Sequence, residues 1–270
     1  MARAGKIALM ALALAAPAAA QDERILIYRP WSWQQAHDLG APGLIGERAF
    51  ATSLTDTFID RLRARRWDLI VIRSYEQWPR SDEILAELEV HLARGGRLLI
   101  QHAEIEEWPD LQAFLGLAGA VDLLPEPVDL YGEEPFHPSI DESGGAGVDP
   151  TAPWWPDVGD ILTPADGGYV IAEYVTGGPA VVVAGSTRII VNGAEWDAYS
   201  NGFAVLADQM DWLLSCPPDL DGSGELDLFD YLTFLNLFAT GDRHADFAYD
   251  RTLDLFDFLE FQNAFAAGCP

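Results

Sequence analysis

The hydrophobic pattern of residues 21–215 alternates between short apolar runs and stretches with helical spacing. The apolar runs are almost continuous and lie at 24–28, 68–72 and 97–101. Such runs are typical of strands buried on both faces of a parallel sheet. Between them, we expect one helix from Ser53 to about residue 66 and another from Ser81 to Gly95, each capped by its first serine. This order predicts an α/β fold, a mostly parallel sheet with flanking helices.

The second half of this region has a different pattern. A short helix is expected around 110–117, and prolines and glycines over 119–165 predict a long loop region. Three further apolar runs predict short, partly antiparallel strands, at 169–174, 179–184 and 188–191. A last helix is expected over 201–214.

Residues 216–270 contain an internal repeat of 27 residues. Leu-Asp-Leu-Phe-Asp occurs at 226–230 and again at 253–257, and Asn236 and Phe238 recur as Asn263 and Phe265. Two copies at one fixed offset indicate a structural unit used twice. We therefore expect a small all-α module after the α/β domain, with the boundary at residue 216.

The first copy has the spacing of an EF-hand calcium loop. Ca²⁺ prefers six to eight oxygen ligands, which the loop supplies from positions 1, 3, 5, 7, 9 and 12. These positions hold Asp219, Asp221, Ser223, Glu225, Asp227 and Asp230. Position 6 is Gly224, where the loop turns sharply, and position 7 offers its backbone carbonyl. A helix is expected from Leu228, with apolar residues at helical spacing.

The second copy keeps only part of this ligand set. The candidate ligands are Asp246, Asp250, Thr252 through its carbonyl, Asp254 and Asp257. Position 3 is Ala248, which has no side-chain oxygen, and position 6 is Arg251 instead of glycine. We expect this second loop to bind Ca²⁺ more weakly than the first. The alternative is an acidic surface patch between two amphipathic helices.

Composition excludes two classes of partner. The 270 residues include 43 Asp and Glu against 16 Lys and Arg, for a net charge of −27, and 49% are hydrophobic. The hydrophobic fraction is high enough for a folded core. Nucleic acids and anionic membranes require a basic footprint, so the charge argues against both as partners.

The N-terminus has the features of a secretory signal peptide. Arg3 and Lys6 precede a short apolar run, and three alanines at 18–20 suit cleavage before Gln21. No later run reaches the ~18 apolar residues of a membrane span. We therefore expect residues 1–20 to be removed and the mature protein to be secreted or held at the cell surface, without a transmembrane segment.

Cysteine and lysine usage limits the possible chemistry. Lys6 is the only lysine, so the mature chain can form no lysine Schiff base and has no Walker P-loop. Cys216 and Cys269 are the only cysteines and bracket the repeat. In an exported protein such a pair is expected to form a disulfide.

The repeat resembles a dockerin, in particular the variant that ends in Gly-Cys. The first loop, the duplicated Leu-Phe-Asp helix start, residues 263–265 and the ending Gly268-Cys269 carry this resemblance. The resemblance covers about 55 residues and departs at Ala248 and Arg251. It implies two loop-helix motifs packed antiparallel, with a helix face offered to a cohesin-like or envelope protein.

The α/β region resembles the class I glutamine amidotransferase-like fold, which is flavodoxin-like in its sheet, and is nearest to its ThuA-like branch. Residues 95–103 and the helix end at 212–214 carry this resemblance. Amidotransferases need a cysteine at a strand-to-helix elbow, and here residues 101–104 read Gln-His-Ala-Glu. The chain is therefore not expected to have amidotransferase activity.

The end of the third strand offers weak candidates for other chemistry. Ligands in open α/β sheets bind beyond the carboxyl ends of the strands. His102, Glu104 and Glu106 follow this strand and could act as acid and base or bind a metal. With Glu107 and Asp110, they would carry a carbohydrate-active hydrolase, one alternative function. A hydrogen-bonded histidine beside solvated glutamates is the structural alternative.

Tryptophans supply the other alternative function, a glycan-binding module. Trp31 and Trp33 follow the first strand, and further tryptophans occur at 78, 108, 154 and 155. Sugar rings stack on aromatic faces, but aromatic residues are more often part of the core. The main expectation from the sequence is an exported Ca²⁺-binding protein that attaches to a partner through its C-terminal module.

Overall fold

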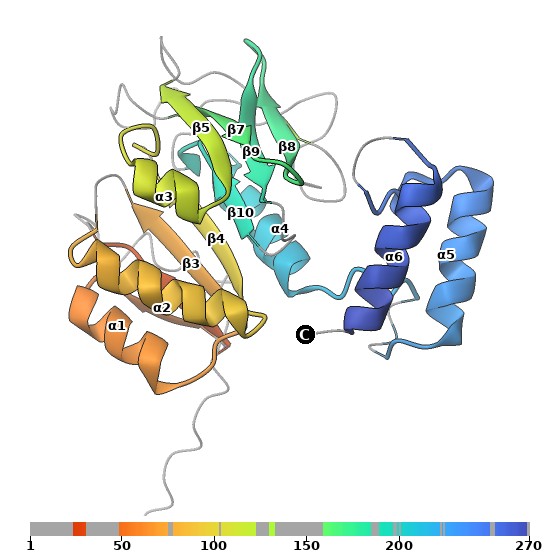
Figure 1. Ribbon diagram of the computed structural model, residues 1–270, viewed down its shortest axis with the longest axis horizontal. Coiled ribbons are helices and arrows are strands. Elements are labelled where there is room, and N and C mark those ends of the chain that lie inside the picture. Colours follow the sequence, from red (N-terminus) through yellow and green to blue (C-terminus); the bar gives the residue numbers. More distant parts are fainter. Residues whose placement is uncertain are drawn as a thin grey trace, which may run out of the picture.

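A computed structural model describes most of the two regions expected from the sequence. The described residues are 24–30, 49–74, 78–102, 104–122, 130–132, 159–184, 189–196, 199, 201–221, 223, 225–248 and 252–268. The expected signal peptide lies outside them. Within the described residues, none of the helices combines the length and apolarity needed to cross a membrane. Figure 1 shows an α/β part beside a pair of C-terminal helices.

The main sheet has eight strands in the order β2-β1-β3-β4-β10-β9-β8-β6. Their bounds are β1 Ile25–Tyr28, β2 Ala49–Thr52, β3 Leu69–Ser74, β4 Arg97–His102, β6 Leu130–Gly132, β8 Tyr169–Tyr174, β9 Pro179–Val183 and β10 Ile189–Asn192. Pairing is parallel from β2 through β10 and antiparallel from β10 through β6. The α/β fold, with parallel pairing through its centre and flanking helices, is therefore confirmed, as are the antiparallel late strands.

Helices cover both faces of this sheet, as Figure 1 shows. Helices α1 (Thr55–Ala64), α2 (Ser81–Ala93) and α3 (Pro109–Phe114) lie on one face, and α4 (Gly202–Leu214) lies on the other. Side chains alternate between the faces along each central strand: Ile70 packs towards α1 and α2, and Val71 packs towards α4. Because both faces are covered, all six residues of β3 are buried.

Two helices begin at different residues from those expected. Leu54, not Ser53, precedes α1, and the hydroxyl of Thr52 accepts a hydrogen bond from its amide (3.1 Å). Ser81 is the first residue of α2, and Arg80 occupies the cap with φ of 57°. Neither predicted serine cap is therefore correct. The helices are specified by their buried apolar faces, which include Phe58 in α1.

The expected loop over 119–165 contains regular structure. Strand β5 (Leu117–Asp122) pairs antiparallel with β7 (Asp160–Pro164) in a second, two-stranded sheet. β6 lies in the same stretch and extends the main sheet. The prediction of a long loop was wrong there because small residues such as Gly119 and Ala120 hide the alternating pattern of β5.

The C-terminal helices α5 (Leu228–Thr240) and α6 (Leu255–Ala267) share an aromatic core. Phe234 and Phe261, separated by the repeat length of 27, stack with centroids 4.0 Å apart and planes 3° apart. Phe247 meets both rings edge-on. This cluster contains no residue from the two clusters of the main sheet. The repeated sequence therefore forms a core of its own.

Candidate functional site

Three aspartates of the first loop converge on one point. Asp219, Asp221 and Asp230 each place a carboxylate oxygen within 4.8 Å of the other two. They are positions 1, 3 and 12 of the loop expected from the sequence. Their donor atoms are all oxygens and carry negative charge, which suits a hard cation such as Ca²⁺.

Asp230 is held in place by the backbone of the loop it closes. Its side chain is fully buried, Oδ1 accepts the amide of Asp221 (3.2 Å) and Oδ2 accepts the amide of Asp227 (2.9 Å). Burial raises the pKa of Asp230, but hydrogen bonds from backbone amides, including that of Leu220, outweigh burial and lower it below its ordinary value. The carboxylate is therefore the form that the fold selects.

The other predicted ligands of this loop have structural contacts of their own. The hydroxyl of Ser223 donates to the carbonyl oxygen of Glu225 (3.1 Å). Asp227 is the N-cap of α5 and accepts the amide of Phe229 (2.7 Å), which completes a capping box with Asp230. The sequence had assigned Asp227 only as a ligand, and it also starts the helix.

The second loop repeats these hydrogen bonds at an offset of 27 residues. Asp257 is also fully buried and accepts the amides of Ala248 (2.9 Å) and Asp254 (2.7 Å). Asp254 caps α6 by accepting the amide of Phe256 (2.7 Å). The second copy thus retains the frame of the first, although Ala248 supplies only an amide where Asp221 also brings a carboxylate.

Several predicted site residues lie outside the described residues. They include Asp250 and Arg251 of the second loop, Trp31, Trp33 and Cys269. Asp246 and Thr252 are described, but of the described residues only the first loop and a glutamate turn gather three ligands. Cys216 does not carry a free thiol. Its pairing with Cys269 stays a prediction.

An apolar stripe on α5 faces solvent, although its helical spacing is that of a core face. The same three positions are exposed in α6, with nearly equal exposed fractions in the first two pairs. The pairs are Leu228 and Leu255 (both 66%), Phe229 and Phe256 (64% and 63%), and Leu232 and Leu259 (51% and 43%). Large exposed apolar side chains grouped in this way are typical of an interaction surface.

At the carboxyl edge of the main sheet, His102 is enclosed by aromatic rings. Its side chain is 1% exposed and meets Trp108 edge-on, with Trp78 on the other side. Its Nδ1 accepts the amide of Glu104 (3.0 Å), so a neutral ring carries its proton on Nε2. This environment supports the structural alternative for His102. Trp78 and Trp108 are themselves buried, so they present no face to a sugar.

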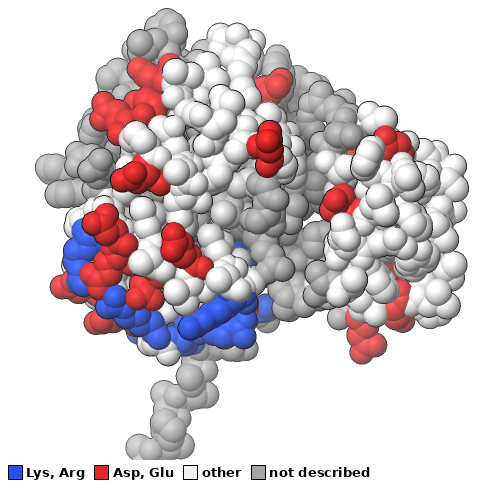
Figure 2. Space-filling view, in the orientation of Figure 1, with Lys and Arg blue, Asp and Glu red and all other residues white. Residues whose placement is uncertain are grey.

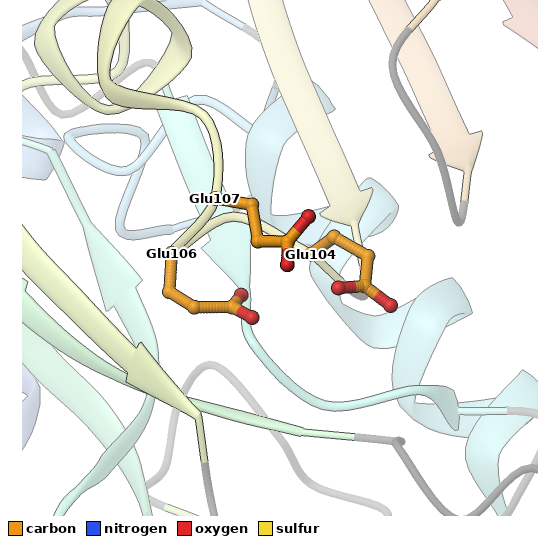
Figure 3. A group of neighbouring side chains, drawn as sticks. All are labelled: Glu104, Glu106 and Glu107. Atoms are coloured by element: carbon orange, nitrogen blue, oxygen red, sulfur yellow. The ribbon is translucent and has the colours of Figure 1, made fainter.

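The glutamates after β4 lie together on one turn. Figure 3 shows the carboxylates of Glu104, Glu106 and Glu107 pointing to the same side, and one oxygen from each lies within 4.8 Å of the others. The side-chain amide of Gln112 holds the turn by donating to the carbonyls of Ile105 (2.8 Å) and Glu106 (3.1 Å). Three acids from one turn approach a ligand from one side, unlike the facing pair of a glycosidase.

The sequence did not identify a buried polar network at the same edge. Gln101 of β4 donates to Glu195 (2.7 Å), and the amide of Asn192 exchanges hydrogen bonds with Gln209 of α4 (2.8 and 2.9 Å). All four side chains are buried. The signal was present as polar residues inside apolar runs, because buried polar groups must find partners.

Comparisons with known proteins assign neither a family nor an activity. No family model matches the chain, and no curated protein matches it. Among solved structures, it is similar to a GMP synthase subunit from Thermoplasma acidophilum. The two are 11% identical, the match covers 71% of this chain and 94% of the other, and the TM-score is 0.47. This similarity is too low to place the chain in a family.

Proposed function

We propose that this chain is an exported Ca²⁺-binding protein that attaches to a partner through its C-terminal module. Ca²⁺ binds the first loop through Asp219, Asp221 and Asp230, with the carbonyl of Glu225 and the side chains of Ser223 and Asp227 completing the shell. The module is dockerin-like, and its partner is a cohesin-like or envelope protein. The α/β domain is the part carried to that location.

The convergence of three carboxylates in the first loop is the observation that carries this proposal. Residues 216–270 contain 11 Asp and Glu against two Arg, so these groups repel one another in the absence of a counterion. A divalent cation removes that repulsion and uses the oxygen donors already gathered by the loop. The second loop, with Ala248 at position 3, contributes a weaker site or none.

The exposed stripe on α5 and α6 supports attachment to a protein partner. Leu228, Phe229 and Leu232 follow directly after the Ca²⁺ loop, so ligand binding fixes the start of the helix that presents them. A partner with a complementary apolar surface would bury these side chains at about 25 cal/mol per Å². Ca²⁺ dependence of attachment follows from this arrangement.

Calcium titration by calorimetry tests the metal site. We expect the full mature chain to bind one equivalent strongly, and the variant Asp219→Asn with Asp221→Asn to lose that equivalent. Asp110→Asn serves as the charge-matched control, because Asp110 is an exposed acid on α3 away from the loop. An unchanged isotherm in the double variant would reject the first loop as the site and direct attention to the glutamate turn.

Pull-down with a candidate cohesin-like protein tests the attachment face. We expect binding with Ca²⁺, and loss of binding after Leu232→Asp with Leu259→Asp, while the calcium isotherm stays unchanged. Val175→Asp is the control, since Val175 is an exposed apolar residue of the α/β domain. Binding that persists in a chelator would contradict the Ca²⁺-dependent mechanism.

A further inference from the structure

Basic residues gather at the amino ends of β3 and β4, opposite the edge that holds His102. A groove of about 520 Å³ is found there. Five of its lining residues are arginines: Arg63, Arg65, Arg66, Arg94 and Arg97. Figure 2 shows Lys and Arg side chains collected along this lower edge of the α/β part. These five represent nearly a third of the chain's 16 Lys and Arg, in a protein of net charge −27.

The carboxylates in the groove are already paired with arginines. Glu87 accepts a hydrogen bond from Arg63 (2.7 Å), and Asp68 pairs with Arg24 just outside the groove. In the part of the chain that the structure describes, no ion pair joins Arg65 or Arg94 to an acid. The groove therefore keeps an excess of positive charge.

The remaining guanidinium groups are held so that they cannot disperse. Arg65 lies over the ring of Trp67, 4.1 Å from its centroid, and Trp67 is buried. Arg66 donates to the backbone carbonyl of Arg94 (2.8 Å), which is a neutral acceptor and leaves the positive charge in place. Like charges held close together repel, so an anion that enters the groove gains from each of them. Guanidinium groups also present paired donors that match phosphate, sulfate and carboxylate oxygens.

The size of the groove and the charge around it limit the ligand. A volume of about 520 Å³ lies within the usual range for small-molecule sites. A long polyanion would extend over the acidic remainder of the surface and be repelled, whereas a small one would stay inside the basic groove. We propose that this groove binds a small molecule carrying two or more oxyanionic groups, of the phosphate or carboxylate class.

The C-terminal module contributes to the rim of the groove. Gly268, the residue that follows α6, is among its lining residues. The site is therefore tested in the full mature chain, with the disulfide oxidised. It uses no residue of the calcium loops, so it can fail or succeed independently of the proposed attachment function.

Calorimetric titration with pyrophosphate and with citrate, at low ionic strength in metal-free buffer, tests the proposal. We expect saturable binding of at least one probe, and the stronger probe identifies phosphate or carboxylate as the preferred group. Binding should weaken when salt is raised, as expected for exposed charges. Absence of heat for both probes up to about 10 mM would overturn the proposal, because weaker binding would not be specific.

Variants locate the binding to the groove. Arg65→Gln with Arg94→Gln should weaken the preferred probe by about tenfold or more, since two charge-assisted contacts are lost. Arg80→Gln is the matched control: Arg80 is an exposed arginine outside the groove, and its loss changes the net charge in the same direction. Equal weakening in the control would overturn the site assignment. Arg94→Gln alone, at an exposed position, repeats the test without disturbing the contact of Arg65 with Trp67.

Discussion

Asp230 and Asp257 occupy equivalent positions and make equivalent hydrogen bonds. Each buried carboxylate accepts two amides of its own loop, and each completes the capping box of its helix. What differs is the neighbourhood: Asp230 lies beside Asp219 and Asp221, while position 3 of the second loop is Ala248. The pair therefore separates the structural role of this residue from its proposed role in binding metal.

Substituting each of these aspartates by alanine should give similar losses of stability and different losses of Ca²⁺ affinity. Either change leaves backbone amides without their acceptor, at about 1–3 kcal/mol. Only Asp230→Ala should abolish the strong calcium equivalent. Urea unfolding in chelator measures the first quantity, and calorimetric titration measures the second. Equal loss of calcium binding in the two variants would mean that both loops form the site together.

His91 is a second residue whose environment has a measurable consequence. The ring is buried, Nε2 bonds to the carbonyl of Arg97 (2.9 Å), and a Cβ on Gly96 would collide with it. Burial lowers the pKa of His91, and the charges of Arg66 and Arg97 act in the same direction. The carbonyl of Arg97 and the charge of Asp68 oppose them without reversing the shift. The neutral ring is therefore the form that the folded state favours.

Because its pKa is lower in the folded than in the unfolded state, His91 should make stability fall as pH drops below about 6.5. The contribution of one proton cannot exceed about 1.4 kcal/mol per pH unit. His91→Gln keeps a donor for the carbonyl of Arg97 but cannot titrate, so its stability should depend less on pH. Urea unfolding of the α/β transition at pH 7.5, 6.5 and 5.5 makes the comparison. Parallel profiles for the two proteins would contradict this role.

At the scale of elements, α4 depends on a close approach of backbones. A Cβ placed on Gly202, the first residue of α4, would lie 1.8 Å from the carbonyl oxygen of Trp196. Backbone cannot move aside as a flexible side chain can. The glycine is thus required for the helix to begin where it does and to cover its face of the sheet.

Gly202→Ala should therefore destabilise the α/β part by about 1–3 kcal/mol or more, the range for overpacked sites. Gly119→Ala is the control, because a Cβ there meets nothing within 4 Å and the backbone has no positive φ. Its unfolding midpoint should stay within about 0.5 kcal/mol of the wild type. If Gly202→Ala were equally silent, α4 would have to shift along the sheet without cost.

The elements also show which parts of the fold were predictable. The central strands and the helices after them were readable because continuous apolar runs and amphipathic spacing are direct consequences of burial. β2 was missed because it is a four-residue edge strand with intermediate burial of most residues. The calcium loop was readable from spacing alone, since its ligands are consecutive along the chain. The groove was not, because its arginines come from two helix ends that only the fold brings together.

At the scale of the molecule, the apolar clusters divide the chain into two cores. The sheet carries one cluster on each face, and the aromatic core around Phe234 and Phe261 belongs to the C-terminal module alone. Ligands of one part should therefore stabilise that part with little effect on the other. Ca²⁺ provides the means to test this independence.

Calorimetric melting of the full mature chain should show two transitions, of which Ca²⁺ raises only one. A ligand at 100 times its Kd adds about 2.7 kcal/mol, which for so small a module corresponds to about 10 °C or more. The α/β transition should move by no more than about 1 °C, because the proposed ligands all lie outside its clusters. In the variant Asp219→Asn with Asp221→Asn, neither transition should respond to calcium. A single transition that rises as a whole with Ca²⁺ would show instead that the two cores unfold together, and that contacts such as the one Gly268 makes at the arginine groove couple them.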